Sequence, residues 1–200
     1  LCGLLPVTSG ELRVAGVDVV RSRTAARNNF GYVAQKFSLY GNLTVMENLK
    51  FFAGVYGLYG QKKKERIEAV VEEFRLTDVK NMMAGDLPGG YKQRLSMATA
   101  LIHEPKILFL DEPTSGIDPL TRRNFWRQIT ALSKRGTTII VTTHFMDESE
   151  YCDRIMIQDA GKLVILGAPD EVRRIAGNEN YTMDEAFISV ILEKRKQEGD

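Results

Sequence analysis

The sequence predicts an α/β fold in which a parallel sheet is joined to a small helical subdomain. Strand-like segments alternate with helix-like segments, which is typical of a parallel sheet with crossover helices. The run Ile107–Leu110 is apolar without alternation, as in a strand buried on both faces. We therefore expect residues 1–200 to form one domain, with 1–36 and 104–200 in the α/β core and 37–103 in the helical subdomain.

The composition is that of a globular protein with balanced charge. Hydrophobic residues make up 44% of 200 residues, and 27 basic residues oppose 26 acidic ones, so the sequence gives no reason to expect a nucleic-acid partner. Cys2 and Cys152 have no metal-ligand spacing and fit a reducing compartment. No apolar run reaches the ~18 residues that span a bilayer, so we expect any membrane association to come through a partner.

The first part of the chain contains short β-like segments. Leu1–Leu5 has the character of an element that begins earlier, and we expect the chain to be truncated at its start. The alternation in Leu12–Val20 predicts an outer strand or hairpin. Arg21–Asn28 is polar and basic, as in a short helix or a loop. Phe30–Ala34 is predicted as another strand, which ends at Gln35.

The helical subdomain carries clear start signals. Thr44 is predicted to cap a helix, because Glu47 follows three residues later as in a capping box. The next helix is indicated by Ile67, Val70, Val71 and Phe74, which recur at helical spacing. The break at Leu87–Gly90 is expected to precede a third helix.

The last part of the chain is predicted to alternate helices and strands. Asp118 and Pro119 are a good cap and first residue for a helix, and Thr137–Thr142 is β-branched like a strand. A hairpin is expected around Asp159–Gly161, and a helical tail is expected after Gly167–Asp170, to about Lys196.

Polar side chains follow two neighbouring strands of the predicted sheet. Asp111 and Glu112 follow the buried strand, and His144 follows the next one. Because parallel strands bind ligands at their carboxyl ends, we expect these groups at one edge of the sheet. Asp111 can then hold a metal ion through its waters while Glu112 polarises a water molecule, and Gln35 ends an earlier strand within reach of the metal. For an isolated Asp-Glu pair, the alternative is a solvated acidic loop.

Gly89 and Gly90 stand directly before a predicted helix. Free backbone N–H groups and the positive end of the helix dipole suit a phosphate there, and glycine allows a close approach. Considered alone, the pair also fits an ordinary loop.

Together these segments resemble the nucleotide-binding domain of ABC transporters over nearly the whole chain. Ile107–Glu112 resembles the Walker B strand, Thr114–Asp118 the D-loop, Thr142–His144 the switch histidine and Gln35 the Q-loop glutamine. A set of motifs in fixed order is far more specific than any single motif. The residues after His144 and after the Walker B strand are most similar to bacterial drug-exporter ATPases.

The resemblance implies an ATPase that binds ATP and Mg²⁺ and works as a dimer of two such domains. It also implies a transmembrane permease as partner and a place on the cytoplasmic face of the membrane, held there through the permease. The implied residues are Glu112 and His144 for catalysis, Asp111 and Gln35 for the metal, and Gln35, Gly89, Gly90 and Asp118 for the nucleotide.

The sequence departs from the family pattern in two places. The signature, usually Leu-Ser-Gly-Gly-Gln, has Pro88 in place of serine and Tyr91 in place of glutamine. The Walker A pattern, Gly-x-x-x-x-Gly-Lys followed by Ser or Thr, appears nowhere in the 200 residues. We expect the first strands and the phosphate-binding loop to be absent from this chain, and the chain alone to be inactive.

Three functions remain open from the sequence. The first is an ATPase that energises a membrane exporter, and the second is a soluble ABC-type ATPase of translation. The third is a catalytically degenerate regulatory partner, which Pro88 and Tyr91 suggest. Repair ATPases of this type are excluded, because the segment between Gln35 and the signature is too short for their long coiled coils.

Overall fold

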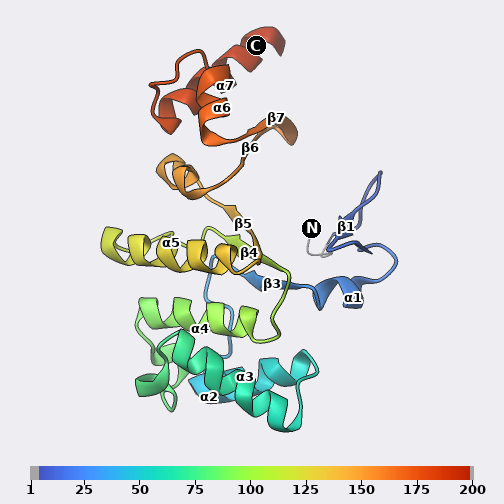
Figure 1. The fold of residues 1–200 in the computed structure, drawn as a ribbon, viewed down its shortest axis with the longest axis vertical. Coiled ribbons are helices and arrows are strands. Elements are labelled where there is room, and N and C mark those ends of the chain that lie inside the picture. Colours follow the sequence, from blue (N-terminus) through green and yellow to red (C-terminus); the bar gives the residue numbers. More distant parts are fainter. Residues whose placement is uncertain (1–4, 199–200) are drawn as a thin grey trace. The chain divides into compact units, whose positions relative to one another are not determined.

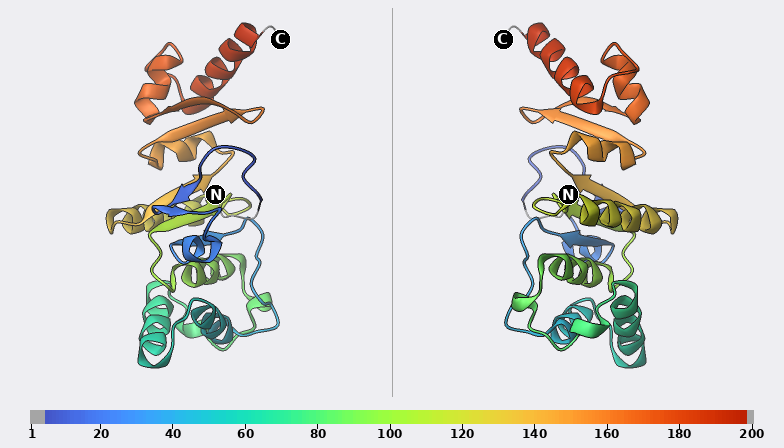
Figure 2. Two further views of the ribbon diagram at one scale, coloured as in Figure 1. Left: turned by 90° about the vertical axis from the view of Figure 1, so that its right-hand side faces the viewer. Right: turned by 90° about the vertical axis from the view of Figure 1, so that its left-hand side faces the viewer.

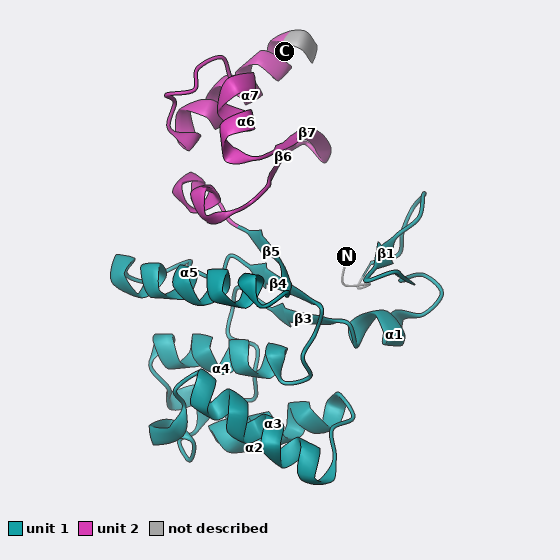
Figure 3. Ribbon diagram, in the orientation of Figure 1, with its two compact units in different colours: residues 1–142 teal, residues 143–200 magenta. Residues whose placement is uncertain are grey.

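The computed structural model describes residues 5–198, in two compact units that comprise residues 1–142 and 143–200 (Figure 3). Apart from Leu5, the element expected at Leu1–Leu5 lies outside the described residues. The boundaries expected for a core and a helical subdomain stay a prediction. No helix within residues 5–198 has both the length and the apolar character needed to cross a bilayer.

Three parallel strands form the central sheet of the first unit. They are β3 (Phe30–Val33), β4 (Ile107–Asp111) and β5 (Thr138–Thr142), in the order β3-β4-β5 (Figure 1). Val33 pairs with Leu110, and Asp111 with Thr142. The predicted α/β fold with a parallel sheet is confirmed, and the carboxyl ends of all three strands meet at one edge.

One face of the sheet packs closely against helix α4 (Gly89–Leu101). Leu108 and Leu110 are buried, as predicted for this strand. Gly31 of β3 allows the close approach, because a Cβ atom there would lie 2.2 Å from the carbonyl oxygen of Ala100. The sheet therefore fixes α4 directly, and with it the turn where α4 begins.

The other face is partly covered by a small N-terminal layer. Strands β1 (Arg13–Val14) and β2 (Val17–Asp18) form the predicted outer hairpin, and helix α1 (Arg23–Arg27) follows. The rings of Phe30 and Phe109 meet edge to face, with centroids 5.4 Å apart. The buried residues of this layer are Val14, Val19, Ala26, Phe30 and Phe109.

Helices α2 (Val45–Val55) and α3 (Gly60–Glu73) pack against each other and against α4 (Figure 2). The predicted capping box of α2 is confirmed, because Thr44 Oγ1 accepts a hydrogen bond from the Glu47 backbone N–H at 3.2 Å and Glu47 Oε2 accepts one from the Thr44 N–H at 2.8 Å. Between α3 and α4 the chain forms two short 3₁₀ helices, η1 (Thr77–Val79) and η2 (Ala84–Asp86).

Helix α5 (Pro119–Lys134) joins β4 to β5. Its predicted start is confirmed, because Asp118 Oδ1 accepts hydrogen bonds from the N–H groups of Leu120 and Thr121, both at 3.0 Å. Phe125, Ile129 and Leu132 recur at helical spacing on α5 and are buried, and Trp126 is buried beside them.

The second unit contains the predicted hairpin and a helical tail. Its elements are η3 (Met146–Tyr151), β6 (Ile155–Asp159), β7 (Lys162–Gly167), α6 (Pro169–Ile175) and α7 (Met183–Glu198). β6 and β7 pair in antiparallel fashion. The helical tail is interrupted after α6, where Gly177 has a φ of +98°, a value that favours glycine.

Candidate functional site

Asp111 is the last residue of β4, and both neighbouring strands bind its carboxylate. Its Oδ1 accepts a hydrogen bond from Thr142 Oγ1 of β5 at 2.6 Å, and its Oδ2 accepts one from the Tyr32 hydroxyl of β3 at 3.1 Å. These bonds fix the orientation of the carboxylate at the sheet edge. Each oxygen keeps a further lone pair with which it can accept a hydrogen bond or hold a metal-bound water.

Glu112 begins a sharp turn directly after the strand. Its φ of +42° lies in the left-handed region, which costs a non-glycine residue roughly 1–3 kcal/mol. The backbone N–H of Glu112 donates to the Thr142 carbonyl oxygen at 3.0 Å, which anchors the turn to β5. Such strain at an acidic residue on a sheet edge favours a functional role over a solvated acidic loop.

Gln35 and Glu112 are brought together, although they are far apart in sequence. The Gln35 amide nitrogen Nε2 donates a hydrogen bond to Glu112 Oε2 at 2.8 Å. Because the nitrogen contacts Glu112, the amide oxygen is the atom of Gln35 that can bind a metal. The predicted site residues of the first two strand ends, Gln35, Asp111 and Glu112, therefore form one group.

Gly89 and Gly90 are the first two residues of α4, not the loop before it, because Pro88 acts as the N-cap. Pro88 makes no side-chain hydrogen bond to the helix. No atom lies within 4 Å of the place where a Cβ of either glycine would be. Neither glycine is therefore needed for packing, and the backbone N–H groups of this turn suit an anion.

Two contacts tie the first turns of α4 to the residues that follow Gln35 and Glu112. The Gln93 amide nitrogen donates to the Pro113 carbonyl oxygen, and the Lys92 ammonium lies 5.6 Å from the centre of the Phe37 ring. Neither contact was predicted from the sequence. For Gln93 the sequence offers one indication, that it follows Gly90 at helical spacing, and for Lys92 it offers none.

Asn48 is a further residue that was not predicted from the sequence. It is fully buried in α2, and its side chain donates to the Tyr40 carbonyl oxygen at 2.9 Å and accepts from the Tyr40 N–H at 3.1 Å. It also donates to the carbonyl oxygens of Leu43 and Thr44. Asn48 therefore holds the segment between Gln35 and α2 in one conformation. A polar residue beside the apolar stripe of the predicted helix is the signal that points to it.

Asp118 is exposed and caps α5. Hydrogen bonds from Thr121 and Leu120 hold the pKa of its carboxyl below the usual value, because they favour the charged form. This role at the helix start is structural. The expectation that Asp118 reaches across a dimer stays a prediction.

His144 lies two residues beyond β5 and belongs to the second unit, so its predicted action together with Glu112 stays a prediction. The turn around it is well bonded: Thr143 Oγ1 accepts from the Phe145 N–H at 3.0 Å and donates to Glu148 Oε2 at 2.7 Å. Glu148 is fully buried. The His144 ring lies against the ring of Phe145, with centroids 4.1 Å apart.

The described site fits a magnesium ion but only part of a nucleotide site. Within residues 5–198 no three His, Cys, Asp or Glu side chains gather as metal ligands. Mg²⁺ does not need such a group, since it commonly binds one or two protein oxygens, waters and substrate phosphates. Asp111 and the Gln35 amide oxygen match that ligand type. The lysine of a Walker A loop is not in the sequence.

Comparison with known proteins identifies the family of this chain. The sequence pattern of the family described as "ABC transporter" matches residues 1–115. The chain is 51% identical to the "Probable multidrug ABC transporter ATP-binding protein YbhF" of Escherichia coli, over 100% of this chain and 35% of that protein. It is 34% identical to the "Linearmycin resistance ATP-binding protein LnrL" of Bacillus subtilis, over 96% of this chain and 64% of that protein.

The chain thus spans about a third of the length of the first relative and under two thirds of the second. A solved structure described as "Structure of ATP binding subunit of ABC transporter" is similar in fold, with a TM-score of 0.84 and 27% identity over 95% of this chain and 80% of that one. The sheet edge with Asp111 and Glu112, the sequence match and the shared fold agree: the chain belongs to the ABC transporter family, as part of its ATP-binding domain.

Proposed function

We propose that this chain is part of an ATP-binding and ATP-hydrolysing subunit or domain that energises an ABC exporter of the drug-efflux type. The observation that carries the proposal is the hydrogen bond of 2.8 Å between Gln35 and Glu112, beside the anchored carboxylate of Asp111. The names of the relatives, which refer to multidrug transport and linearmycin resistance, support the export class.

The chemistry that we propose follows from the orientation of each side chain. Gln35 donates to Oε2 of Glu112 and thereby orients the carboxylate that would accept a proton from an attacking water. Asp111 is still paired within the sheet, whereas Glu112 lies in the turn after it. The two carboxylates therefore leave the sheet edge from different backbone conformations. When bound, Mg²⁺ would neutralise charge on the phosphates, and Asp111 and Gln35 would hold it.

We propose that a second ATPase domain completes the site. In that arrangement, Gly89 and Gly90 bind the phosphate of a nucleotide held by the second domain, Asp118 reaches toward that domain and His144 contacts the phosphate. The assembly would act at the cytoplasmic face of the membrane through a permease. Because the Walker A pattern is not among the 200 residues, we propose that these residues alone do not hydrolyse ATP.

The altered signature favours one other function, a regulatory partner that binds but does not hydrolyse ATP. Pro88 provides no hydroxyl at the start of α4 and makes no side-chain cap, so a donor found in the usual signature is missing. A soluble ATPase of translation has no observation of this kind in its favour.

The test is ATP turnover by the full-length protein and by its Glu112→Gln variant. We expect turnover to fall at least about 100-fold in the variant, because the general base is lost. Glu68→Gln is the matched control, since Glu68 is an exposed residue of α3 away from the sheet edge. A folded wild type that binds ATP without turning it over would support the regulatory partner. Turnover that survives Glu112→Gln would contradict the proposed role of Glu112.

A further inference from the structure

A groove lies between α4 and α5, separate from the sheet edge. It has a volume of about 480 Å³. Its walls come from the N-terminal parts of the two helices, which line it at helical spacing, and from the segment after α3. Gln35, Asp111 and Glu112 do not line it, whereas Pro88, Gly90 and Tyr91 at the start of α4 do.

The groove carries positive charge that the described chain does not neutralise. Arg75, Arg94 and Arg127 line it, and no acidic residue is among its lining residues. None of these three arginines forms an ion pair with an acidic residue within residues 5–198. A concave surface with charges of one sign concentrates the electrostatic potential and attracts counter-ions.

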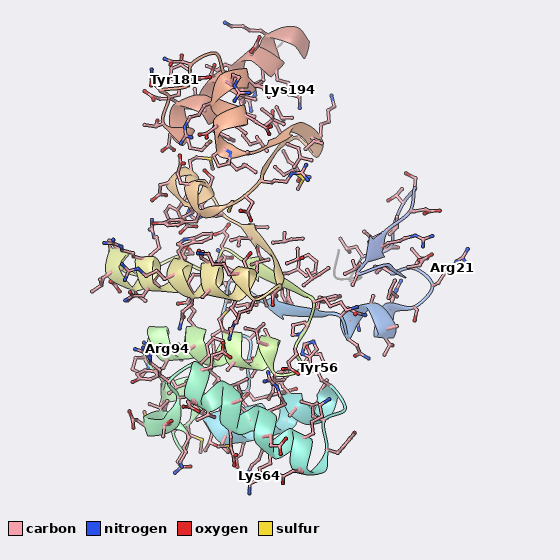
Figure 4. The ribbon with its side chains drawn as sticks, viewed as in Figure 1. Arg21, Tyr56, Lys64, Arg94, Tyr181 and Lys194 are labelled. Atoms are coloured by element: carbon pink, nitrogen blue, oxygen red, sulfur yellow. The ribbon has the colours of Figure 1, made fainter. Side chains whose placement is uncertain are left out.

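The arginine at the centre of the α4 wall is held in place before any ligand binds. The Arg94 guanidinium lies 5.1 Å from the centre of the Tyr91 ring, and Figure 4 shows Arg94 projecting from α4. Stacking on an aromatic ring limits the rotamers of arginine, so less entropy is lost when the guanidinium binds an anion. Tyr91 is also where the signature departs from the family pattern.

Neutral hydrogen-bonding groups stand between the charged ones. Thr121, Asn124 and Gln128 of α5 line the opposite wall, and the side-chain amides of Asn124 and Gln128 can donate hydrogen bonds to oxygens. Guanidinium groups bind phosphate oxygens in pairs, and hydroxyl and amide groups supply single donors. The combination suits a compact group with several oxygens and more than one negative charge.

We propose that this groove binds a phosphorylated ligand, with Arg94 and Arg127 as its main charge contacts. The phosphates belong either to a small soluble molecule or to a lipid headgroup, since both present the same oxygens to the arginines. The groove is large enough for more than one phosphate group. The groove shares Gly90 with the proposed nucleotide site, but its charge contacts are the side chains of Arg94 and Arg127, which the proposed function does not use.

The probe for a soluble ligand is inorganic tripolyphosphate, added to the purified full-length protein. Binding is measured by calorimetry and by the fluorescence of Trp126, the single tryptophan of the 200 residues, which is buried beside the groove residue Phe125. The probe for a headgroup is flotation with vesicles of phosphatidic acid in phosphatidylcholine, compared with phosphatidylcholine alone.

The variants are Arg94→Gln and Arg127→Gln, and Arg123→Gln is the matched control. Arg123 is an exposed arginine of the same helix as Arg127 and does not line the groove. We expect each groove variant to weaken binding of at least one probe about tenfold or more. We expect no more than a twofold change in Arg123→Gln. Arg127 is exposed, so its replacement is not expected to disturb folding even if that of Arg94 does.

The outcomes distinguish a soluble ligand from a lipid headgroup, and they distinguish binding in the groove from binding at the proposed hydrolysis site. Loss with tripolyphosphate alone identifies a soluble ligand, and loss with vesicles alone identifies a headgroup. Binding that persists in both Glu112→Gln and Gly90→Ala but is lost in Arg127→Gln belongs to the arginines of the groove and not to the proposed nucleotide site. The proposal is overturned if neither probe binds, if Arg123→Gln weakens binding as much as Arg127→Gln, or if only an acidic peptide binds through these arginines.

Discussion

Helices α4 and α5 both begin near the carboxyl edge of the parallel sheet, but the first turns of the two helices are capped differently. Asp118 caps α5 with two hydrogen bonds to backbone N–H groups, and Pro119 supplies a favourable first residue. At the start of α4 stand Pro88, which makes no side-chain cap, and two glycines with open space around them. The start of α5 is stabilised by its own residues, whereas that of α4 keeps the features of an anion site.

The first test of this comparison removes the hydrogen bond between α4 and the turn that follows Glu112. In Gln93→Leu the Pro113 carbonyl loses its donor, and because Pro113 is buried we expect the free energy of unfolding to fall by about 1–3 kcal/mol. We also expect ATP turnover to fall roughly tenfold, since Pro113 follows Glu112 and its position guides the proposed base. Chemical denaturation and steady-state ATPase assays measure the two effects.

Gln61→Leu is the control for that substitution, because Gln61 lies in the exposed first turn of α3 and bonds only to Glu65 of its own helix. Lower stability with unchanged turnover in Gln93→Leu would mean that this contact holds the fold without positioning Glu112.

The second test removes the cap of α5. In Asp118→Ala the N–H groups of Leu120 and Thr121 lose their acceptor, so we expect the thermal midpoint to fall by about 2–4 °C. Asp118→Asn keeps a capping oxygen and is expected to retain most of the midpoint. If the Asp118→Asn variant were as unstable as the alanine variant, the cap would not explain the role of Asp118. A loss of ATP turnover in Asp118→Asn at full stability would show a role for the charge beyond the cap.

The same difference between the helix starts predicts a pH dependence. The hydrogen bonds of the cap lower the folded-state pKa of Asp118 below its ordinary value of 3.8. The carboxylate therefore stabilises the fold fully above that ordinary value, and its contribution is lost as the pH falls through the lower folded-state pKa. We expect the midpoint of wild type minus that of Asp118→Ala to be constant near neutral pH and to shrink below about pH 4. A difference that grows in acid would contradict the direction of this pKa shift.

Features with local signals were predicted from the sequence, and features set by packing were not. The buried strand β4 and the caps at Thr44 and Asp118 follow from residues next to one another, and the structure confirms them. The grouping of Gln35 with Glu112 follows from the shared strand edge. To predict this grouping, only the order of the strands in the sheet is required.

The partners missed by the sequence analysis depend on strand register and helix phase. Tyr32 and Thr142 bind Asp111 only because β3 and β5 align with β4 as they do. Gln93 reaches Pro113 only because α4 lies close against β3 at Gly31. Neither alignment can be read from neighbouring residues, because tertiary packing sets both.

Gly90→Ala is the substitution that is expected to change the fold least, and it tests most directly why α4 begins with glycine. Gly90→Ala adds a methyl group where no atom lies within 4 Å, so we expect stability to rise by roughly 0.5–1 kcal/mol through a better helix propensity. If the glycine serves a phosphate, ATP turnover falls at least about tenfold in the same variant, because a side chain keeps the anion from the backbone.

Gly54→Ala in the last turn of α2 is the matched control, in which a stabilisation in the same direction is expected with unchanged turnover. The deciding measurement is ATP turnover and unfolding on the same preparations of wild type, Gly90→Ala and Gly54→Ala. The account predicts a Gly90→Ala protein that is more stable and less active. A Gly90→Ala protein that is more stable and fully active would contradict it, because the start of α4 would then be no more than the beginning of a helix.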